Sequence, residues 1–193
     1  FRRVLFRSLK LDDLQAEQAV MILHEGIAVA GRVTDAAGHP IAGADLLAGE
    51  DYFARDWTKT DAAGNFRFPH LRTINTSFLL TVQAKGFAPQ RKELPSEKGL
   101  ALVEFVLQPA KLLLGRVIDG AGRPVADAFV TTERWKRYRT VRWQSNTDSQ
   151  GRFTWDYPPA DAIEIRVNKE GFREITKEVV ADGREQTFVL TQP

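Results

Sequence analysis

The sequence predicts an all-β protein that consists of two tandem antiparallel β-sandwich domains in an end-to-end arrangement. Three observations support this prediction: an internal repeat, a hydrophobic period of two residues within each copy, and turn signals between short apolar runs. Short strands at regular spacing with such turns are typical of β-sandwiches. A length of 193 residues is sufficient for two small domains.

The internal repeat is clearest in two segments that begin 84 residues apart, GRVTDAAGHPIAGADL at Gly31 and GRVIDGAGRPVADAFV at Gly115. Nine of their sixteen positions are identical. The correspondence continues through a T-D-x-x-G-x-F motif and a Gly-Phe turn to the last apolar run of each copy. Because each copy of a repeat forms one structural unit, we predict one sandwich over residues 27–109 and a second over residues 110–193.

Within each copy, apolar and polar side chains alternate. In the first run, Val29 and Val33 share one face and Arg32 lies on the other. This period indicates strands with one buried and one solvated face, which is typical of antiparallel sheets. The same alternation predicts further strands around residues 44–46, 66–68, 80–84, 105–107, 163–167 and 188–190.

Turns of the form Asp-x-x-Gly separate these runs and begin at Asp35, Asp61, Asp119 and Asp148. The Asp carboxylate accepts hydrogen bonds from nearby backbone N–H groups, and Gly at the fourth position adopts a positive φ without strain. Equivalent acids recur at turn positions in both copies. We therefore interpret them as structural, in preference to a calcium-binding or catalytic role.

The first 26 residues precede the two copies. Residues 1–8, FRRVLFRS, match the translation of a widely used sequencing-adapter primer, and we interpret them as a non-native scar. Without their three arginines the chain has 24 basic and 25 acidic residues, a formal net charge of −1 in place of +2. This balance does not suggest a nucleic-acid partner. Residues 9–26 match the tail strand of a preceding repeat, which predicts that the chain is a window from a longer array.

The motif G-x-V-x-D-x-x-G-x-P-[IV]-x-x-A, then T-D-x-x-G, then a Gly-Phe turn, occurs twice in the same order. It resembles the carboxypeptidase regulatory-like domain family, which is similar to the transthyretin-like sandwich of some metallocarboxypeptidases. The resemblance implies a prealbumin-like, immunoglobulin-like or carbohydrate-binding-like fold over residues 27–193. It also implies a module without catalytic residues of its own, found in bacterial surface proteins, beside peptidases and ahead of outer-membrane receptors.

Several kinds of chemistry are not supported by the composition. The chain has no cysteine, so it has no disulfide, thiolate nucleophile or cysteine-ligated zinc. Its three histidines are not spaced as a metal pair, and no nucleophile elbow or phosphate loop is present. No apolar run approaches the ~20 residues of a membrane-spanning helix. We expect no enzymatic activity, no metal, no cofactor and no transmembrane segment in this window.

The copies differ most between their second strand and the T-D turn. The first copy has AGEDYFARDWTK there, whereas in the second copy aromatic residues alternate with basic ones. The candidate ligand-binding residues are Arg134, Trp135, Arg137, Tyr138, Arg139, Arg142 and Trp143. Aromatic faces stack on sugar rings, and guanidinium groups pair with acidic groups. The alternative is a twisted hairpin whose aromatics cover the core while its arginines extend along them.

Three functions remain open, because a fold by itself defines no activity. The chain is a non-enzymatic spacer, stalk or interaction module of a larger secreted or surface bacterial protein. Alternatively it is a carbohydrate-binding module that uses residues 133–143 to bind a polysaccharide or cell-wall polymer. In the third case it is the accessory domain pair of a peptidase or outer-membrane receptor outside this fragment. The expected partners are neighbouring repeats or a fused domain, and the expected location is extracellular, cell-surface or periplasmic.

Overall fold

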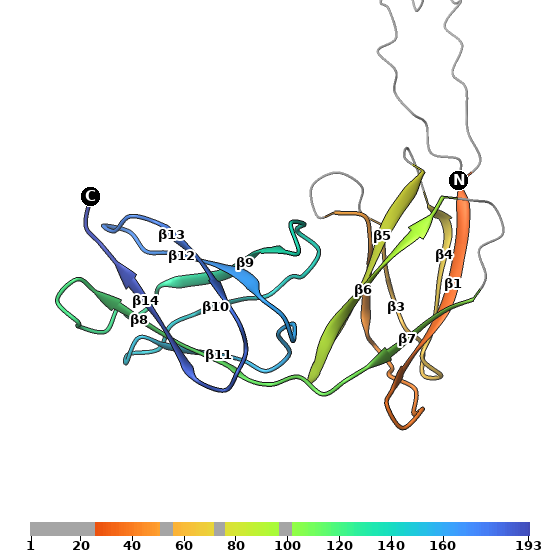
Figure 1. Ribbon diagram of the computed structural model, residues 1–193, viewed down its shortest axis with the longest axis horizontal. Coiled ribbons are helices and arrows are strands. Elements are labelled where there is room, and N and C mark those ends of the chain that lie inside the picture. The colour runs from red at the N-terminus through yellow and green to blue at the C-terminus, as the bar shows by residue number, and fades with distance from the viewer. Residues whose placement is uncertain (1–25, 51–55, 72–75, 97–101) are drawn as a thin grey trace, which may run out of the picture.

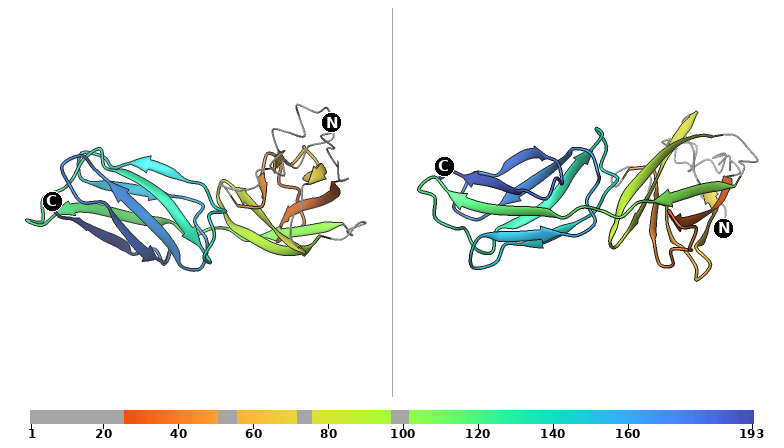
Figure 2. Two further views of the ribbon diagram at one scale, coloured as in Figure 1. Left: turned by 90° about the horizontal axis from the view of Figure 1, so that it is seen from above. Right: turned by 60° about the horizontal axis from the view of Figure 1, so that its bottom comes forward.

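The computed structural model describes residues 26–50, 56–71, 76–96 and 102–193. These residues form fourteen strands in four sheets, with no helix among them. The sheets pair into two sandwiches that lie end to end (Figure 1, Figure 2). The all-β prediction of two tandem sandwiches is therefore confirmed. The proposed scar at residues 1–8 and the proposed repeat tail, up to residue 25, lie outside the described residues.

The first sandwich contains seven strands. They are β1 (Ile27–Asp35), β2 (Asp45–Ala48), β3 (Asp56–Lys59), β4 (Asn65–Leu71), β5 (Ser77–Ala84), β6 (Phe87–Pro95) and β7 (Val103–Leu107). One sheet has the order β4-β1-β7 and the other β3-β2-β5-β6. Their inner faces bury alternate apolar side chains, among them Val33, Leu46 and Phe105, each with 0% exposure.

The second sandwich repeats this topology. Its strands are β8 (Leu113–Asp119), β9 (Phe129–Trp135), β10 (Gln144–Asn146), β11 (Arg152–Trp155), β12 (Ile163–Asn168), β13 (Ile175–Val179) and β14 (Glu185–Leu190). The sheet orders are β11-β8-β14 and β10-β9-β12-β13, which are those of the first sandwich strand for strand. The repeat in the sequence is thus a repeat of the whole topology.

Each sandwich departs from the predicted antiparallel pairing in one place. β1 runs parallel to β7, with Gly31 beside Val103 and Asp35 beside Leu107. β8 runs parallel to β14 in the same way. A parallel pair needs a long crossover between its strands, and here the other five strands of the sandwich provide it. Alternation of apolar residues does not distinguish the two directions, so the sequence pattern could not reveal this pairing.

The Asp-x-x-Gly turns have the predicted geometry. The Asp119 carboxylate accepts hydrogen bonds from the backbone N–H groups of Ala121 and Arg123, both at 2.9 Å. Gly122 follows with a φ of 80°. Asp35 and Asp61 accept the equivalent pairs of hydrogen bonds in the first sandwich. These carboxylates therefore close the turns.

The threonine of the T-D motif has a role that the sequence analysis missed. The Thr147 hydroxyl accepts a hydrogen bond from the Ala128 N–H at 2.9 Å and donates one to the Val125 carbonyl at 2.7 Å. Thr60 makes the same two contacts, with Ala44 and Ile41. Both threonines are buried. Each one satisfies two backbone groups of the irregular segment that precedes the second strand of its sandwich.

Candidate functional site

The linker between the sandwiches is bound to the first domain along most of its length. Residues 108–112 connect β7 to β8. The Ala88 N–H donates to the Gln108 carbonyl at 2.9 Å, and the Ala110 N–H donates to the Gly86 carbonyl at 3.0 Å. A further bridge joins Phe87 to Pro109. The linker therefore continues the first domain's structure as far as Ala110, and only two residues, Lys111 and Leu112, separate this fixed part from β8.

The aromatic and basic residues 133–143 form the end of the second sandwich that faces the first (Figure 1, Figure 2). Arg91 of β6 reaches this segment from the first domain. Its Nη1 donates to the backbone carbonyls of Trp135 at 3.0 Å and Lys136 at 3.4 Å. Its guanidinium carbon lies 5.0 Å from the ring centre of Tyr138 and 5.5 Å from that of Trp135. One arginine thus contacts two rings and two carbonyls of the other domain.

The linker and the residues that contact each other across it, Gln83 and Arg91 with residues 133–143, form the joint between the domains. A second set of contacts crosses this joint at Gln83. The Arg142 N–H donates to the Gln83 Oε1 at 2.9 Å, and the Gln83 Nε2 donates to the Arg142 carbonyl at 3.3 Å. Gln83 is buried, so this reciprocal pair satisfies its amide away from water. The Arg142 side chain lies over the ring of Trp57 in the first domain, 5.3 Å from the ring centre.

The predicted aromatic residues have different surroundings, although Trp135 and Tyr138 both lie beside Arg91. Trp135 is 3% exposed, and its Nε1 donates to Asp161 at 2.9 Å. Trp143 stacks on Trp155, with 5.1 Å between ring centres and 16° between ring planes, and it packs against the core of the second sandwich. Tyr138 remains 37% exposed beside Arg91. The structure therefore does not gather the three rings into one platform.

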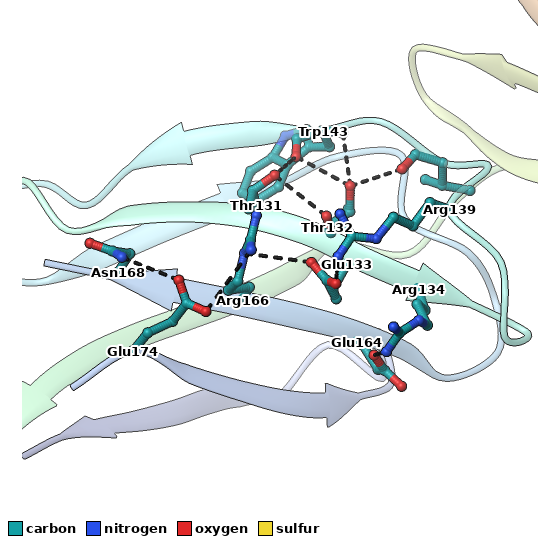
Figure 3. A network of polar contacts seen from close by, with 11 residues as sticks. Thr131, Thr132, Glu133, Arg134, Arg139, Trp143, Glu164, Arg166, Asn168 and Glu174 are labelled. Atoms are coloured by element: carbon teal, nitrogen blue, oxygen red, sulfur yellow. Dashed lines mark hydrogen bonds and ion pairs between the residues drawn. The ribbon is translucent and has the colours of Figure 1, made fainter. Parts of the chain in front are cut away.

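The predicted arginines also have separate surroundings. Arg139 pairs with the buried Glu133, which Arg166 approaches from the other side at 3.5 Å (Figure 3). Arg134 pairs with Glu164 at 3.6 Å. Arg137 lies in the turn after β9, in the left-handed region with a φ of 77°. Of the seven predicted residues, Arg142 and Trp143 are the two that line a cleft between the domains.

This cleft has a volume of about 700 Å³ and takes its walls from both domains. The first domain contributes Asp45, Trp57 and Lys85, and the second contributes Tyr157 together with the two residues named above. Burial raises the pKa of Tyr157, and the carboxylates of Asp156 and Asp45 add to this effect. In the same domain, burial by itself would raise the pKa of Asp161, but hydrogen bonds from Lys136 and Trp135 outweigh this effect and lower that pKa.

Sequence reasoning missed the first-domain half of this site. Arg91 and Gln83 lie on strands whose alternation shows only that they are polar, and no motif marks them. The difference between the two copies was the useful signal, because it located the segment that forms the joint. Among the described residues, no cluster of three or more His, Cys, Asp or Glu could hold a metal ion. Nor does this part of the chain contain a helix long and apolar enough to cross a membrane.

Comparison with solved structures found similarities of low identity. A streptococcal ancillary pilin is 12% identical, with a TM-score of 0.39 over 91% of this chain and 65% of the pilin. The shaft pilin SpaA of Lactobacillus rhamnosus GG is 11% identical, with a TM-score of 0.33 over 88% of this chain and 98% of that one. A 3-chlorocatechol 1,2-dioxygenase of Rhodococcus opacus is 16% identical, with a TM-score of 0.36 over 42% of this chain and 60% of the enzyme.

The chain thus spans less than two thirds of the dioxygenase and of the ancillary pilin, and TM-scores this low support no inference about function. A search of curated proteins found no match. The family comparison is decisive by contrast. The model of the carboxypeptidase regulatory-like domain matches residues 28–108 and again residues 113–191. The chain belongs to the carboxypeptidase regulatory-like domain family and contains two tandem copies of that domain.

Proposed function

We propose that this chain is a non-enzymatic spacer that holds two sandwiches at a fixed angle within a larger secreted or surface bacterial protein. The observation that supports the proposal is the joint itself. The linker is hydrogen-bonded to the first domain, and the segment that distinguishes the second copy forms its contacts with the first. Neighbouring repeats or a fused domain are the partners that we propose for such a spacer.

Arg91 is the residue whose loss should affect the joint most. A net hydrogen bond contributes about 1 kcal/mol, and a partly buried cation–π contact contributes about 0.5–2 kcal/mol. Arg91 makes two of each across the joint. The four contacts share one side chain, so they are not additive, and about 2 kcal/mol is a reasonable total. This value would restrict the two domains to a small set of orientations.

The test is a measurement of residual dipolar couplings on the partially aligned chain. Two domains in a fixed arrangement report one alignment tensor, whereas two domains that reorient independently report different ones. We expect a single tensor for the wild-type chain and diverging tensors for Arg91→Ala. The matched control is Arg67→Ala, at an exposed position on β4. Different tensors in the wild-type chain would contradict the proposal.

A second candidate function is ligand binding in the cleft between the domains. The observation that favours it is Trp57, which is 38% exposed on a cleft wall that also contains Lys85 and Arg142. An exposed ring beside two cationic side chains suits a sugar that bears a carboxylate. This would retain the carbohydrate-binding hypothesis but move it from residues 133–143 as a whole to the cleft.

The test is a titration with an acidic uronate oligosaccharide and, in parallel, a neutral gluco-oligosaccharide, followed by amide chemical shifts. Shifts that cluster around the cleft with the acidic sugar, and that disappear in Trp57→Ala, would support this candidate. Phe129→Ala is the control, since Phe129 is similarly exposed on β9 but does not line the cleft. An unchanged spectrum at millimolar sugar would eliminate this candidate and leave the spacer proposal intact.

A further inference from the structure

The parallel strand pair of each sandwich lies at the two points where the chain enters and leaves that sandwich. β1 is the first strand of the first domain and β7 its last, and they are adjacent in one sheet. β8 and β14 have the same relation in the second domain. A pull on the chain from both sides therefore loads each sandwich through this one pair.

The direction of the load follows from the parallel arrangement. Tension draws the start of β8 backwards along its own axis and the end of β14 forwards along the same axis. The two strands can separate only by sliding past one another, which loads their hydrogen bonds together. In the second domain this ladder joins six residues of each strand, Glu185 to Leu190 beside Leu114 to Asp119. In the first it joins five, from Gly31 to Asp35 beside Val103 to Leu107.

The pair is also attached on its other side. In the first sandwich the Lys92 Nζ, from β6, donates to the Glu104 carbonyl of β7 at 2.6 Å and lies 5.2 Å from the ring centre of Phe105. In the second, the Lys177 Nζ, from β13, donates to the Thr187 carbonyl of β14 at 2.9 Å and lies 5.4 Å from the ring centre of Phe188. β7 and β14 lie at the edge of their sheets, and a lysine from the opposite sheet binds each of them on the side that has no neighbouring strand.

Buried side chains add resistance to sliding. Val117 of β8 and its neighbour Phe188 of β14 are both 0% exposed, as are Val33 and Phe105 of the equivalent pair. Any displacement along the strand would pull these side chains out of close-packed positions. The chain then passes from β7 through the linker into β8 without reversing direction, so the two pairs lie in series along the load (Figure 2).

From this geometry we infer that β1–β7 and β8–β14 are mechanical shear clamps, which allow each sandwich to bear tension along the chain without unfolding. The inference rests on the proposed spacer function for its setting, since a spacer transmits force between its neighbours. It does not depend on the fixed angle, because each clamp lies within one sandwich.

The absence of cysteine allows the inference to be tested by pulling the full chain from two engineered thiols. Leu112→Cys with Thr191→Cys attaches handles at the start of β8 and the end of β14, and therefore loads the pair in shear. Leu112→Cys with Arg184→Cys attaches both handles at the same end of the pair, and therefore peels the strands apart one hydrogen bond at a time. All three positions are exposed, so neither double variant should disturb folding.

Forced unfolding reports the height of the unfolding barrier under load, and several hydrogen bonds that break together resist more than the same bonds that break in turn. We expect the shear pair to unfold at a force about twofold or more above that of the peel pair at the same pulling speed. Equal forces in the two geometries would overturn the inference. The handles lie within the second sandwich or directly before its first strand, so this outcome is independent of the dipolar-coupling test of the joint.

Discussion

Replacing Gly115 by Ala should destabilise the second sandwich, because an aromatic ring already fills the space that the new methyl group needs. Gly115 is the first residue of the repeated G-R-V motif and lies on β8 beneath the ring of Phe153. A Cβ at this position would lie 2.0 Å from Cζ and 2.2 Å from Cε1 of that ring. Carbon atoms in good contact are about 3.5–4.0 Å apart, so the ring would have to move by roughly 1.5 Å.

The ring has no free space into which to move. Phe153 is 4% exposed, and its centre lies 5.8 Å from that of Trp143 and 5.6 Å from that of Phe188. Overpacking of such a core costs about 1–3 kcal/mol, whereas the reduced chain entropy of Ala relative to Gly returns about 0.4–1 kcal/mol. An approach of 2.0 Å belongs in the upper part of the first range, so after this offset we expect Gly115→Ala to lower the free energy of unfolding of the second sandwich by about 1–2 kcal/mol.

Urea unfolding followed by tryptophan fluorescence suits this test, because three of the four tryptophans, Trp135, Trp143 and Trp155, lie in the second sandwich. Gly120→Ala is the matched control. No atom lies within 4 Å of a Cβ at that position, so its effect should stay within about 0.5 kcal/mol. In a double-mutant cycle, Phe153→Leu should partly rescue Gly115→Ala because it removes the end of the ring. Equal midpoints for the two glycine variants, or no rescue, would refute the reasoning.

Three further predictions concern the repeated motifs. Thr147→Val should lower the free energy of unfolding by about 2–3 kcal/mol, because it leaves the Ala128 N–H and the Val125 carbonyl buried without partners. The control Thr147→Ser retains both hydrogen bonds and should cost less than about 1 kcal/mol. Equal losses for the two variants in urea unfolding would contradict this role of the threonine. Lys177→Met should cost about 1 kcal/mol in the same assay, since it removes the hydrogen bond to the Thr187 carbonyl, whereas Lys111→Met, at an exposed linker position, should not. Hydrogen bonds from the backbone of Arg123 and Asn65 lower the pKa values of Asp119 and Asp61 below 3.8 in the folded chain. The stability that these two carboxylates contribute is therefore fully present above pH 3.8 and is lost as the pH falls through their lower pKa values in the folded chain. The thermal midpoint should decrease over that pH range, and it should decrease less steeply in Asp119→Asn. An unchanged dependence of the midpoint on pH in that variant would show that the Asp119 turn does not contribute.

The repeat and its local structure could be predicted because their signals are local. Period-two alternation marked strands such as Ile27–Asp35 and Ile163–Asn168, and Asp119 and Gly122 marked a turn by chemistry confined to four residues. The sequence pattern did not reveal what Gly115 and Thr147 contact. The space beside Gly115 is filled by the ring of Phe153, which lies 38 positions later in the chain, and the Thr147 hydroxyl donates to the carbonyl of Val125, which lies 22 positions earlier.

By itself, the sequence determined the fold class, the duplication and the turns, because each depends on residues close together in the chain. Tertiary structure decided what residues 133–143 contact, since their partners Arg91 and Gln83 lie 44 to 59 positions away in the other domain. It also decided the direction of pairing between β1 and β7, because strands of either direction bury the same alternate side chains. A pattern of residue types records which side chains need partners, and only the folded chain shows which partners lie within reach.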